Sequence, residues 1–389
     1  MRALLANTNL QILFAVTLMV VMGVSSIIPV LPTLIKVFGV TPENIGLVLT
    51  AFTLPGVLFT PIFGILADRL GRKKILVPAL VLFGVAGFAC TLARNWELLL
   101  LLRFLQGTGA AAFGMINITI IGDIFSGSER TAALGLNASV LSIGTAVYPA
   151  IGGGLAILGW HYPFALPLVA VALAGLVLWC LDTPEPETTQ SLGAYFRHAA
   201  TQLRKRQAIG LFLCTLGTFI LLYGPFVTFF PLLLDSRFQA TAPQIGMLIS
   251  VASLITALAA SQLGRLVHYF SEIRLLRAAF LGYALTFAII PEFTSFAWLL
   301  APTLAFGAAQ ALSIPNIMSL LNDLATPQTR AAFMAANGTI LRLGQTLAPL
   351  CMGSIYAFSG LRAVFWSGSV IALVLFSLTY VFLRPRDSA

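Results

Sequence analysis

Long apolar stretches recur along nearly the whole chain, and they limit the possible folds more than any other feature. A transmembrane helix needs about 20 apolar residues, and twelve stretches reach that length. Only 9% of the 389 residues are charged, whereas a soluble chain carries about a quarter. The sequence therefore predicts an all-α membrane protein. The expected spans are residues 10–35, 44–67, 75–93, 98–121, 131–157, 163–181, 208–233, 244–266, 275–292, 298–321, 331–358 and 363–383.

A polar connector at residues 182–207 separates two sets of six spans. It opens with Asp182-Thr-Pro-Glu-Pro-Glu and closes with Arg204-Lys205-Arg206, and it is the one clear domain boundary. We therefore expect an N-terminal six-helix bundle at 1–181 and a C-terminal one at 208–389.

Positive charge is distributed unequally between the loops on the two sides of the membrane. With the N-terminus inside, sixteen of the 22 lysines and arginines fall in cytoplasmic segments, four in outer loops and two within spans. Such an excess marks the cytoplasmic side. We expect a multi-pass protein of the inner (plasma) membrane with both termini in the cytoplasm. The net charge of +9 forms no basic stripe, so no nucleic-acid partner is expected.

The two halves are related by an internal repeat with a constant offset of 200 residues. Because six spans separate the copies, both halves insert in the same orientation and the repeat is parallel. Two such bundles around a central site can support alternating access by rocking. The matched pairs include Ile45-Gly46 and Ile245-Gly246, Gly107 and Gly307, Asp123 and Asp323, Asn137 and Asn337, and Pro149 and Pro349.

The turn between the second and third spans has the most specific pattern in the chain. It reads Gly64-Ile-Leu-Ala-Asp68-Arg69-Leu-Gly71-Arg72-Lys73-Lys74. Gly71 lets the backbone reverse without a Cβ penalty. The ordered pattern resembles the signature loop between spans 2 and 3 of major facilitator superfamily transporters.

This resemblance implies a role for the turn in the conformational cycle. In that family the loop aspartate faces the N-terminus of span 11, where unpaired amides carry partial positive charge. The arginine that matches Arg72 pairs with an acid at the cytoplasmic end of span 4, which here would be Asp123. The alternative is that the charges only fix a loop. The expected latch consists of Asp68, Arg69, Gly71, Arg72 and Asp123.

Span 4 contains a second pattern that resembles the family, an arginine followed three and four residues later by Gln-Gly. Arg103 lies about 9 Å below the outer end of the span. An arginine at that depth is costly unless it is paired or hydrated, so it indicates function. Snorkelling to the outer headgroups is the alternative. The candidates for coupling are Arg103, Gln106 and Asp123.

Span 5 resembles the motif of the exporter (antiporter) branch, a glycine face that ends in Gly-Pro-x-x-Gly. The residues concerned are Gly135, Gly144, Tyr148, Pro149 and Gly152, and tyrosine replaces the glycine before the proline. Glycines permit close packing, and the proline bends the helix. The motif favours export, and a packing face without directional meaning is the alternative.

The centre of the membrane offers an arginine and no acid. Arg342 falls about 16 Å into span 11, near the middle of a core about 30 Å thick. No span has an acid near its centre, which argues against a cationic substrate and leaves proton coupling without an obvious carrier. We expect the cleft to bind an acidic group, unless the asparagines only join helices. The candidate binding residues are Arg342, Gln345, Asn117, Asn137, Asn316 and Asn337.

The whole pattern resembles the twelve-span drug/metabolite:proton antiporters of the superfamily. The resemblance implies a secondary transporter that exports a drug or metabolite, such as a carboxylate-bearing siderophore, by alternating access in exchange for protons. An uptake symporter or facilitator of a small organic anion, and a non-transporting membrane sensor, are the alternatives.

Enzymatic and ATP-driven functions are not predicted. No HExxH, GxSxG or phosphate-loop pattern occurs, and the four cysteines lie singly in apolar spans, so neither a metal site nor a cofactor is expected. The expected partners are a small-molecule substrate, protons and the lipid bilayer, and the expected state is a monomer.

Overall fold

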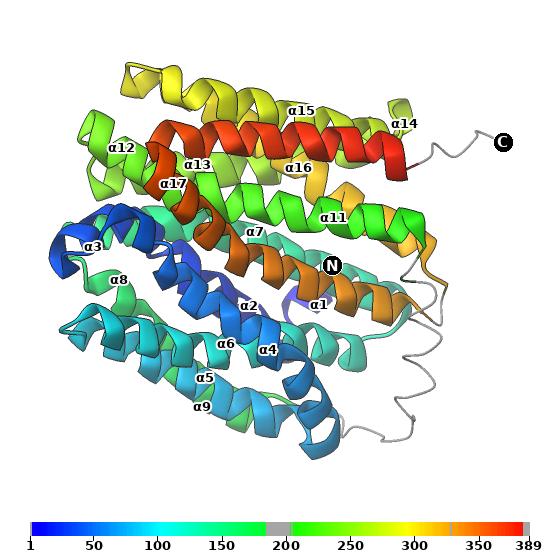
Figure 1. The fold of residues 1–389 in the computed structure, drawn as a ribbon. Helices are drawn as coiled ribbons and strands as arrows, with labels where there is room; N and C mark the ends of the chain where they lie inside the picture. The colour runs from blue at the N-terminus through cyan, green and yellow to red at the C-terminus, as the bar shows by residue number, and fades with distance from the viewer. Residues whose placement is uncertain (1, 184–202, 204, 327–328, 384–389) are drawn as a thin grey trace. The chain divides into compact units, whose positions relative to one another are not determined.

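The computed structural model describes residues 2–183, 203, 205–326 and 329–383. All regular elements in these residues are helices (Figure 1). The all-α prediction is therefore confirmed. Most of the predicted connector, residues 184–202 and 204, lies outside the described part, as do residues 384–389.

The helices of the first half follow the six predicted spans, and several spans are interrupted by short 3-10 turns. The elements are α1 (Arg2–Leu5), α2 (Thr8–Ser25), η1 (Ile28–Val30), α3 (Leu31–Phe38), η2 (Pro42–Asn44), α4 (Leu47–Leu70), α5 (Arg72–Ala89), η3 (Cys90–Leu92), α6 (Trp96–Ile124), α7 (Gly127–Leu155), α8 (Tyr162–Ala165), η4 (Leu166–Leu168) and α9 (Val169–Cys180).

The second half contains one irregularity of a different kind, the π-helical turn η5. Its elements are α11 (Arg206–Leu221), η5 (Leu222–Phe229), α12 (Phe230–Phe238), α13 (Ala242–Ser261), α14 (Leu263–Tyr269), α15 (Glu272–Ile289), η6 (Ile290–Glu292), η7 (Phe296–Leu299), α16 (Leu300–Leu324) and α17 (Arg330–Phe382).

Eleven helical runs among the described residues are long and apolar enough to cross a membrane. The last of them covers 51 residues, Ala332–Phe382, or about 76 Å at 1.5 Å per residue. That is more than twice the thickness of a hydrocarbon core. Gly360 interrupts it with φ 75° and ψ −175°, which is not helical. Each side of Gly360 is long enough to cross once, so the structure is consistent with twelve crossings.

The chain divides into two compact units, and the predicted domain bounds stay a prediction. Residues 42–46 group with the second half and residues 241–250 with the first. Of the described residues, unit 1 comprises 2–41, 47–183 and 241–250, and unit 2 comprises 42–46, 203, 205–240, 251–326 and 329–383.

In unit 1, α6 packs against both α4 and α5 (Figure 1). Two glycines of α6 allow this close approach. A Cβ atom at Gly107 would collide with the backbone carbonyl of Phe52, and one at Gly109 would lie 2.5 Å from that of Ala79. Small residues at helix contacts let backbones approach closely within membranes.

Unit 2 repeats one of these contacts. A Cβ atom at Gly307 of α16 would collide with the carbonyl oxygen of Ala252 in α13. The neighbouring core differs, because Phe306 stacks on Phe226 with ring centroids 3.7 Å apart and lies 5.3 Å from the ring of Tyr283. The repeat thus preserves the backbone contact and changes the side chains around it.

We predict opposite effects for alanine at two glycines of the first half. Gly107→Ala should destabilise the protein by about 1–3 kcal/mol, because the new methyl group collides with backbone that cannot yield. Gly135→Ala should be neutral or stabilising, by at most about 1 kcal/mol, since nothing lies within 4 Å of a Cβ atom there. Thermal unfolding of the purified variants in detergent measures both. Equal midpoints for the two variants would contradict the packing argument.

Candidate functional site

Gly71 is the only residue between the charged ends of α4 and α5. α4 ends at Leu70 and α5 begins at Arg72, and Gly71 has φ 99° and ψ 138°. A positive φ of this size strains any residue with a Cβ atom, so glycine is required there.

Arg72 connects three helix ends at this turn. Its guanidinium lies 3.7 Å from the carboxylate of Asp68 in α4 and forms a second ion pair with Asp123 in α6. The Arg72 side chain is only 11% exposed, whereas Asp68 is 65% exposed and Asp123 is 30% exposed. Arg69 is exposed on the same turn. The structure thus brings Asp68, Arg72 and Asp123 together, and their role as a latch stays a prediction.

A lysine that the sequence analysis did not single out also anchors this end of unit 1. Lys73 donates a hydrogen bond of 3.0 Å to the backbone carbonyl of Leu181, just after α9. Carbonyl groups at a helix C-terminus lack partners within the helix, and a cation there also interacts favourably with the helix dipole.

At the corresponding turn in unit 2, two described side chains, Ser271 and Glu272, form hydrogen bonds. Ser271 accepts a hydrogen bond from the backbone amide of Arg274, at 3.4 Å, and thereby caps α15. Glu272 accepts one from the hydroxyl of Ser319 in α16, at 2.6 Å. The helices α15 and α16 are therefore joined at the place where unit 1 joins α5 and α6 by charge.

Arg103 is completely buried inside unit 1. Its Nε donates to the carbonyl of Val48 at 3.4 Å and its Nη1 donates to Oε1 of Gln106 at 2.6 Å. The guanidinium lies 4.3 Å from the ring centroid of Phe52 and 6.0 Å from that of Phe164. Aromatic faces compensate a buried cation in part. The side chain does not extend outward, so the structure does not support the snorkelling alternative.

Arg103 and Gln106 retain two side-chain donors without a partner among the described residues, Nη2 and Nε2 respectively. There is little room for a ligand beside them, because a Cβ atom at Gly87 would lie 2.6 Å from Nε2 of Gln106. The pair is therefore a packed interior group, and its role in coupling stays a prediction.

Three of the predicted binding residues form hydrogen bonds to helices of their own unit. Asn137 in α7 accepts a 2.6 Å hydrogen bond from the hydroxyl of Thr17 in α2, and Asn117 in α6 donates one of 2.6 Å to the same hydroxyl. In unit 2, Asn337 in α17 accepts a 2.7 Å hydrogen bond from Thr215 in α11. Both threonines were missed at the sequence level, because an isolated threonine in an apolar span carries no pattern.

All four asparagines are buried, and their surroundings distinguish them from one another. Asn117 and Asn137 are buried and joined through Thr17, which favours the alternative that they hold helices together. Asn316 is also buried, and its amide donates to the backbone carbonyl of Leu312 at 2.7 Å. Asn337 differs, because it borders a hollow.

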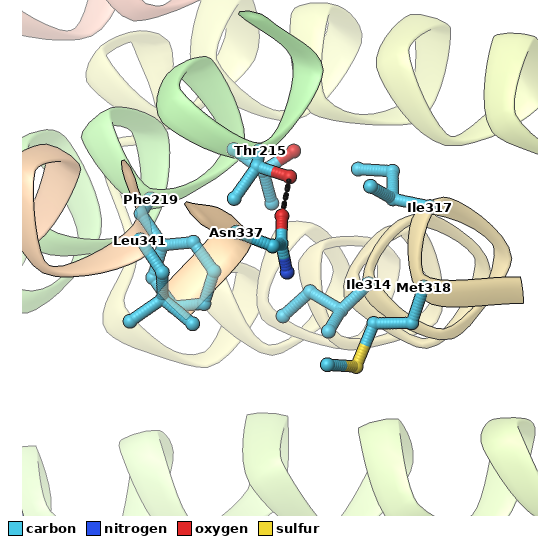
Figure 2. A pocket seen from close by; sticks show the side chains of 8 residues that line it. Thr215, Phe219, Ile314, Ile317, Met318, Asn337 and Leu341 are labelled. Carbon is cyan, nitrogen blue, oxygen red and sulfur yellow. Dashed lines mark hydrogen bonds between the residues drawn. The ribbon is translucent and has the colours of Figure 1, made fainter. Parts of the chain in front are cut away.

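The hollow lies within unit 2 between α11, α16 and α17, and Figure 2 shows it from close by. Its cavity volume is about 20 Å³, which is close to the room that one water molecule needs. The amide oxygen of Asn337 accepts the hydrogen bond from Thr215, and the nitrogen points away from Thr215 (Figure 2). The lining residues are Thr215, Thr218, Phe219, Ile314, Ile317, Met318, Asn337 and Leu341.

Arg342 is the next residue along α17 after Leu341, which lines the hollow. Its Nη1 lies 3.4 Å from Oε1 of Gln345, and both side chains lie close to the hydroxyl of Tyr223. No ion pair among the described residues includes Arg342. The arginine is half-buried, in contrast to Arg103. The structure thus places Arg342, Gln345 and Tyr223 together, with the positive charge uncompensated by an acid.

Tyr223 was not predicted, although the sequence holds a signal for it. It lies in the π-helical turn η5, whose hydrogen bonding departs from that of an α-helix, and the following residues are Gly224 and Pro225. Glycine and proline inside an apolar span indicate an irregular helix, and π-turns occur frequently at functional sites.

The antiporter-like residues of α7 are not equivalent in the structure. A Cβ atom at Gly152 would collide with the backbone carbonyl of Ser26, and one at Gly144 would lie 3.1 Å from Leu18. Tyr148 and Pro149 are buried. Gly135, by contrast, has open space around it. Close packing is therefore seen at Gly144 and Gly152 and not at Gly135, and the role of the motif in export stays a prediction.

We predict that Thr17→Val destabilises the protein more than Thr215→Val. The first change leaves polar atoms of both Asn117 and Asn137 buried without a partner, and each such group costs about 1–3 kcal/mol. The second leaves only Asn337, which borders a hollow that water can enter. Thermal unfolding in detergent tests the order, and Thr17→Ser is the control that keeps the hydroxyl. A larger loss in Thr215→Val would contradict it.

Comparison with known proteins shows which family this chain matches. The model of the Major Facilitator Superfamily matches residues 13–239 and 208–389. Multidrug resistance protein 1 of Bacillus subtilis (strain 168) is 27% identical over 384 residues, which cover 97% of each chain. The bacillibactin exporter of the same organism is 37% identical over 163 residues, or 40% of each chain.

A solved structure shares the fold over the whole chain. It is a bacterial homologue of the human lysosomal transporter Spinster, with a TM-score of 0.80 and 18% identity. The alignment covers 97% of this chain and 98% of that one.

Proposed function

Because the chain belongs to the Major Facilitator Superfamily, we propose that it exports a small organic molecule by alternating access in exchange for protons. The observation that carries export is the similarity, over 97% of both chains, to a multidrug resistance protein. The partial similarity to a bacillibactin exporter supports the same direction. The protein acts as a transporter rather than an enzyme, in the inner (plasma) membrane with both termini in the cytoplasm.

The proposed substrate carries an acidic group that binds Arg342. A cation near the centre of the membrane costs roughly 3 kcal/mol on insertion scales, and no described ion pair compensates this one. A carboxylate or phosphate could accept two parallel hydrogen bonds from the guanidinium. Gln345 and Tyr223 lie beside it and offer neutral hydrogen bonds.

Proton exchange requires a group that changes protonation, and the described acids all lie near helix ends or in turns. Asp123 is one such acid, and its partner Arg72 lies at the start of α5. We propose that the proton binds at Asp123 or on the substrate's own acidic group.

We predict that Arg342→Ala abolishes export of anions. In everted membrane vesicles that acidify their interior, the wild type should accumulate an amphipathic carboxylate and should not accumulate a matched cation. Arg342→Lys should retain part of the activity if the positive charge alone recognises the substrate. It should be as inactive as Arg342→Ala if recognition needs the planar guanidinium, which donates two parallel hydrogen bonds. Uptake by right-side-out vesicles instead would indicate a symporter. Accumulation of cations alone, with Arg342→Ala unimpaired, would contradict the anionic substrate.

We also predict that neutralising the latch lowers flux without lowering membrane expression. Asp68→Asn and Asp123→Asn should each reduce accumulation in the same vesicles strongly, because the ion pairs of Arg72 would no longer form in one conformation and break in the other. Glu129→Gln, on the neighbouring helix α7 and outside the cluster, is the control. Normal transport by both variants would remove the latch from the mechanism.

A further inference from the structure

Arg277 in α15 is held against the last turn of α17 by three contacts. Its Nε donates a hydrogen bond of 3.0 Å to the hydroxyl of Thr379, and its Nη2 lies 3.5 Å from the backbone carbonyl of the same residue. The guanidinium carbon lies 3.6 Å from the ring centroid of Tyr380. Thr379 is completely buried, whereas Tyr380 is 59% exposed. The arginine is therefore fixed in orientation at the edge of the protein.

The charge of Arg277 is not neutralised by an acid of the described chain, since none of the described ion pairs includes it. Glu272, the one acid of α15, accepts a hydrogen bond from Ser319 of α16. The bonds of Arg277 to the described residues use Nε and Nη2, and a guanidinium has further N–H donors on Nη1. An aromatic face orients a cation without using its donors. These donors are therefore available to an anion.

Exposed apolar side chains continue from Arg277 and Tyr380 along both helices. Leu281 and Leu285 follow Arg277 by one and two turns on α15, and both are exposed. Leu373 precedes Tyr380 by two turns on α17 and is also exposed. Arg277 and Leu285 are eight residues apart, or about 12 Å along the helix axis. The charge thus lies at one end of an apolar surface.

The two apolar rows border one strip of surface, because α15 packs against the part of α17 that follows Gly360 (Figure 1). Ser369 of α17 donates a hydrogen bond of 2.8 Å to the backbone carbonyl of Ala284 in α15. A Cβ atom at Gly368 would lie 3.2 Å from the ring of Phe287. A strip with one charged end and two apolar sides matches the chemistry of a single phospholipid.

The repeat shows that the charged end of this strip is particular to unit 2. The repeat positions of Arg277 and Tyr380 are Val77 and Cys180 in unit 1, which offer neither a cation nor an aromatic ring. The cation of α5 that holds the last helix of unit 1 is Lys73, which binds a backbone carbonyl. The alternative for Arg277 is the same structural role alone, which predicts no preference for any lipid.

We propose that the strip between α15 and α17 binds one anionic phospholipid, with its phosphate on Arg277 and its acyl chains along Leu281, Leu285 and Leu373. This site goes beyond the proposed transport function and requires only that the chain spans a membrane. Arg274 is exposed one turn nearer the start of α15 and adds positive charge. Tyrosine is enriched at the level of the headgroups, and basic pockets between transmembrane helices bind acidic headgroups.

The test is a lipid titration of the full chain, purified in detergent and observed by native mass spectrometry. Dioleoylphosphatidylglycerol and dioleoylphosphatidylcholine share their acyl chains and differ in net charge. The wild type should bind the first phosphatidylglycerol roughly tenfold or more tightly than phosphatidylcholine, the effect of a hydrogen bond to a charged group. Inorganic phosphate at millimolar concentration should not displace the lipid, because it lacks the acyl chains.

Two matched variants separate lipid binding from the fold. Arg277→Gln removes the charge and keeps a donor for Thr379, so it should fold and should lose most of the preference for phosphatidylglycerol. Arg237→Gln is the control, because Arg237 also binds backbone carbonyls, those of Pro291 and Phe293 beyond the other end of α15. The control should retain the preference of the wild type. Thermal unfolding of both variants in detergent verifies folding.

A third variant keeps the charge and removes the ring that orients it. Tyr380→Leu should weaken the binding of phosphatidylglycerol roughly twofold to fivefold, the effect of an exposed cation–π contact. It also tests the site if Arg277→Gln does not fold.

Four outcomes would overturn the lipid site. The first is equal binding of the two lipids by the wild type, and the second is an unchanged preference in the folded Arg277→Gln variant or in Tyr380→Leu. The third is an equal loss in Arg277→Gln and Arg237→Gln, which would indicate unspecific attraction by surface charge. The fourth is displacement of the lipid by inorganic phosphate, which would indicate an anion site that does not recognise acyl chains.

Discussion

The absence of water from the hydrocarbon core is the constraint on which the rest of this structure depends. A polar group there must find its partner within the protein, which is why the described backbone is helical almost throughout. Side chains follow the same rule. Thr108 and Thr303 donate to backbone carbonyls four residues earlier in their own helices, and Asn137 and Asn337 bond to threonines of neighbouring helices. Some described side chains break the rule, and Arg103, Asn117 and Thr218 each retain a buried polar atom without a partner.

The two halves share a backbone pattern and differ in how they satisfy this constraint. Gly107 and Gly307 both press against a carbonyl of the neighbouring helix. The residue one before each glycine differs, since Gln106 bonds a buried arginine and Phe306 stacks on another ring. A repeat therefore preserves positions where backbones touch, because any side chain would separate them, while side-chain chemistry nearby is free to diverge.

Much of the fold could be predicted from the sequence, because apolar length and glycine spacing act locally. The twelve spans, the repeat and the turn at Gly71 are of this kind. The partners of Asn137 and Asn337 could not be predicted, since Thr17 and Thr215 lie more than 100 residues away. The eight-residue π-turn around Tyr223 was also missed, because it depends on hydrogen-bond geometry rather than on composition. Arg342 was identified by depth alone, and its neighbours emerged only from the structure.

The polar pairs also bear on how rigid each bundle is during rocking. Thr17 joins α2 to α7, and Thr215 joins α11 to the first part of α17. These bonds lie inside one unit each, so they can persist when the units move. The charged turn is different, because Asp68 is mostly exposed and can exchange partners at little cost. The proposed substrate anchor Arg342 and its partner Gln345 both lie within unit 2. In the proposed transport cycle their contact can therefore persist, and only access to it needs to change.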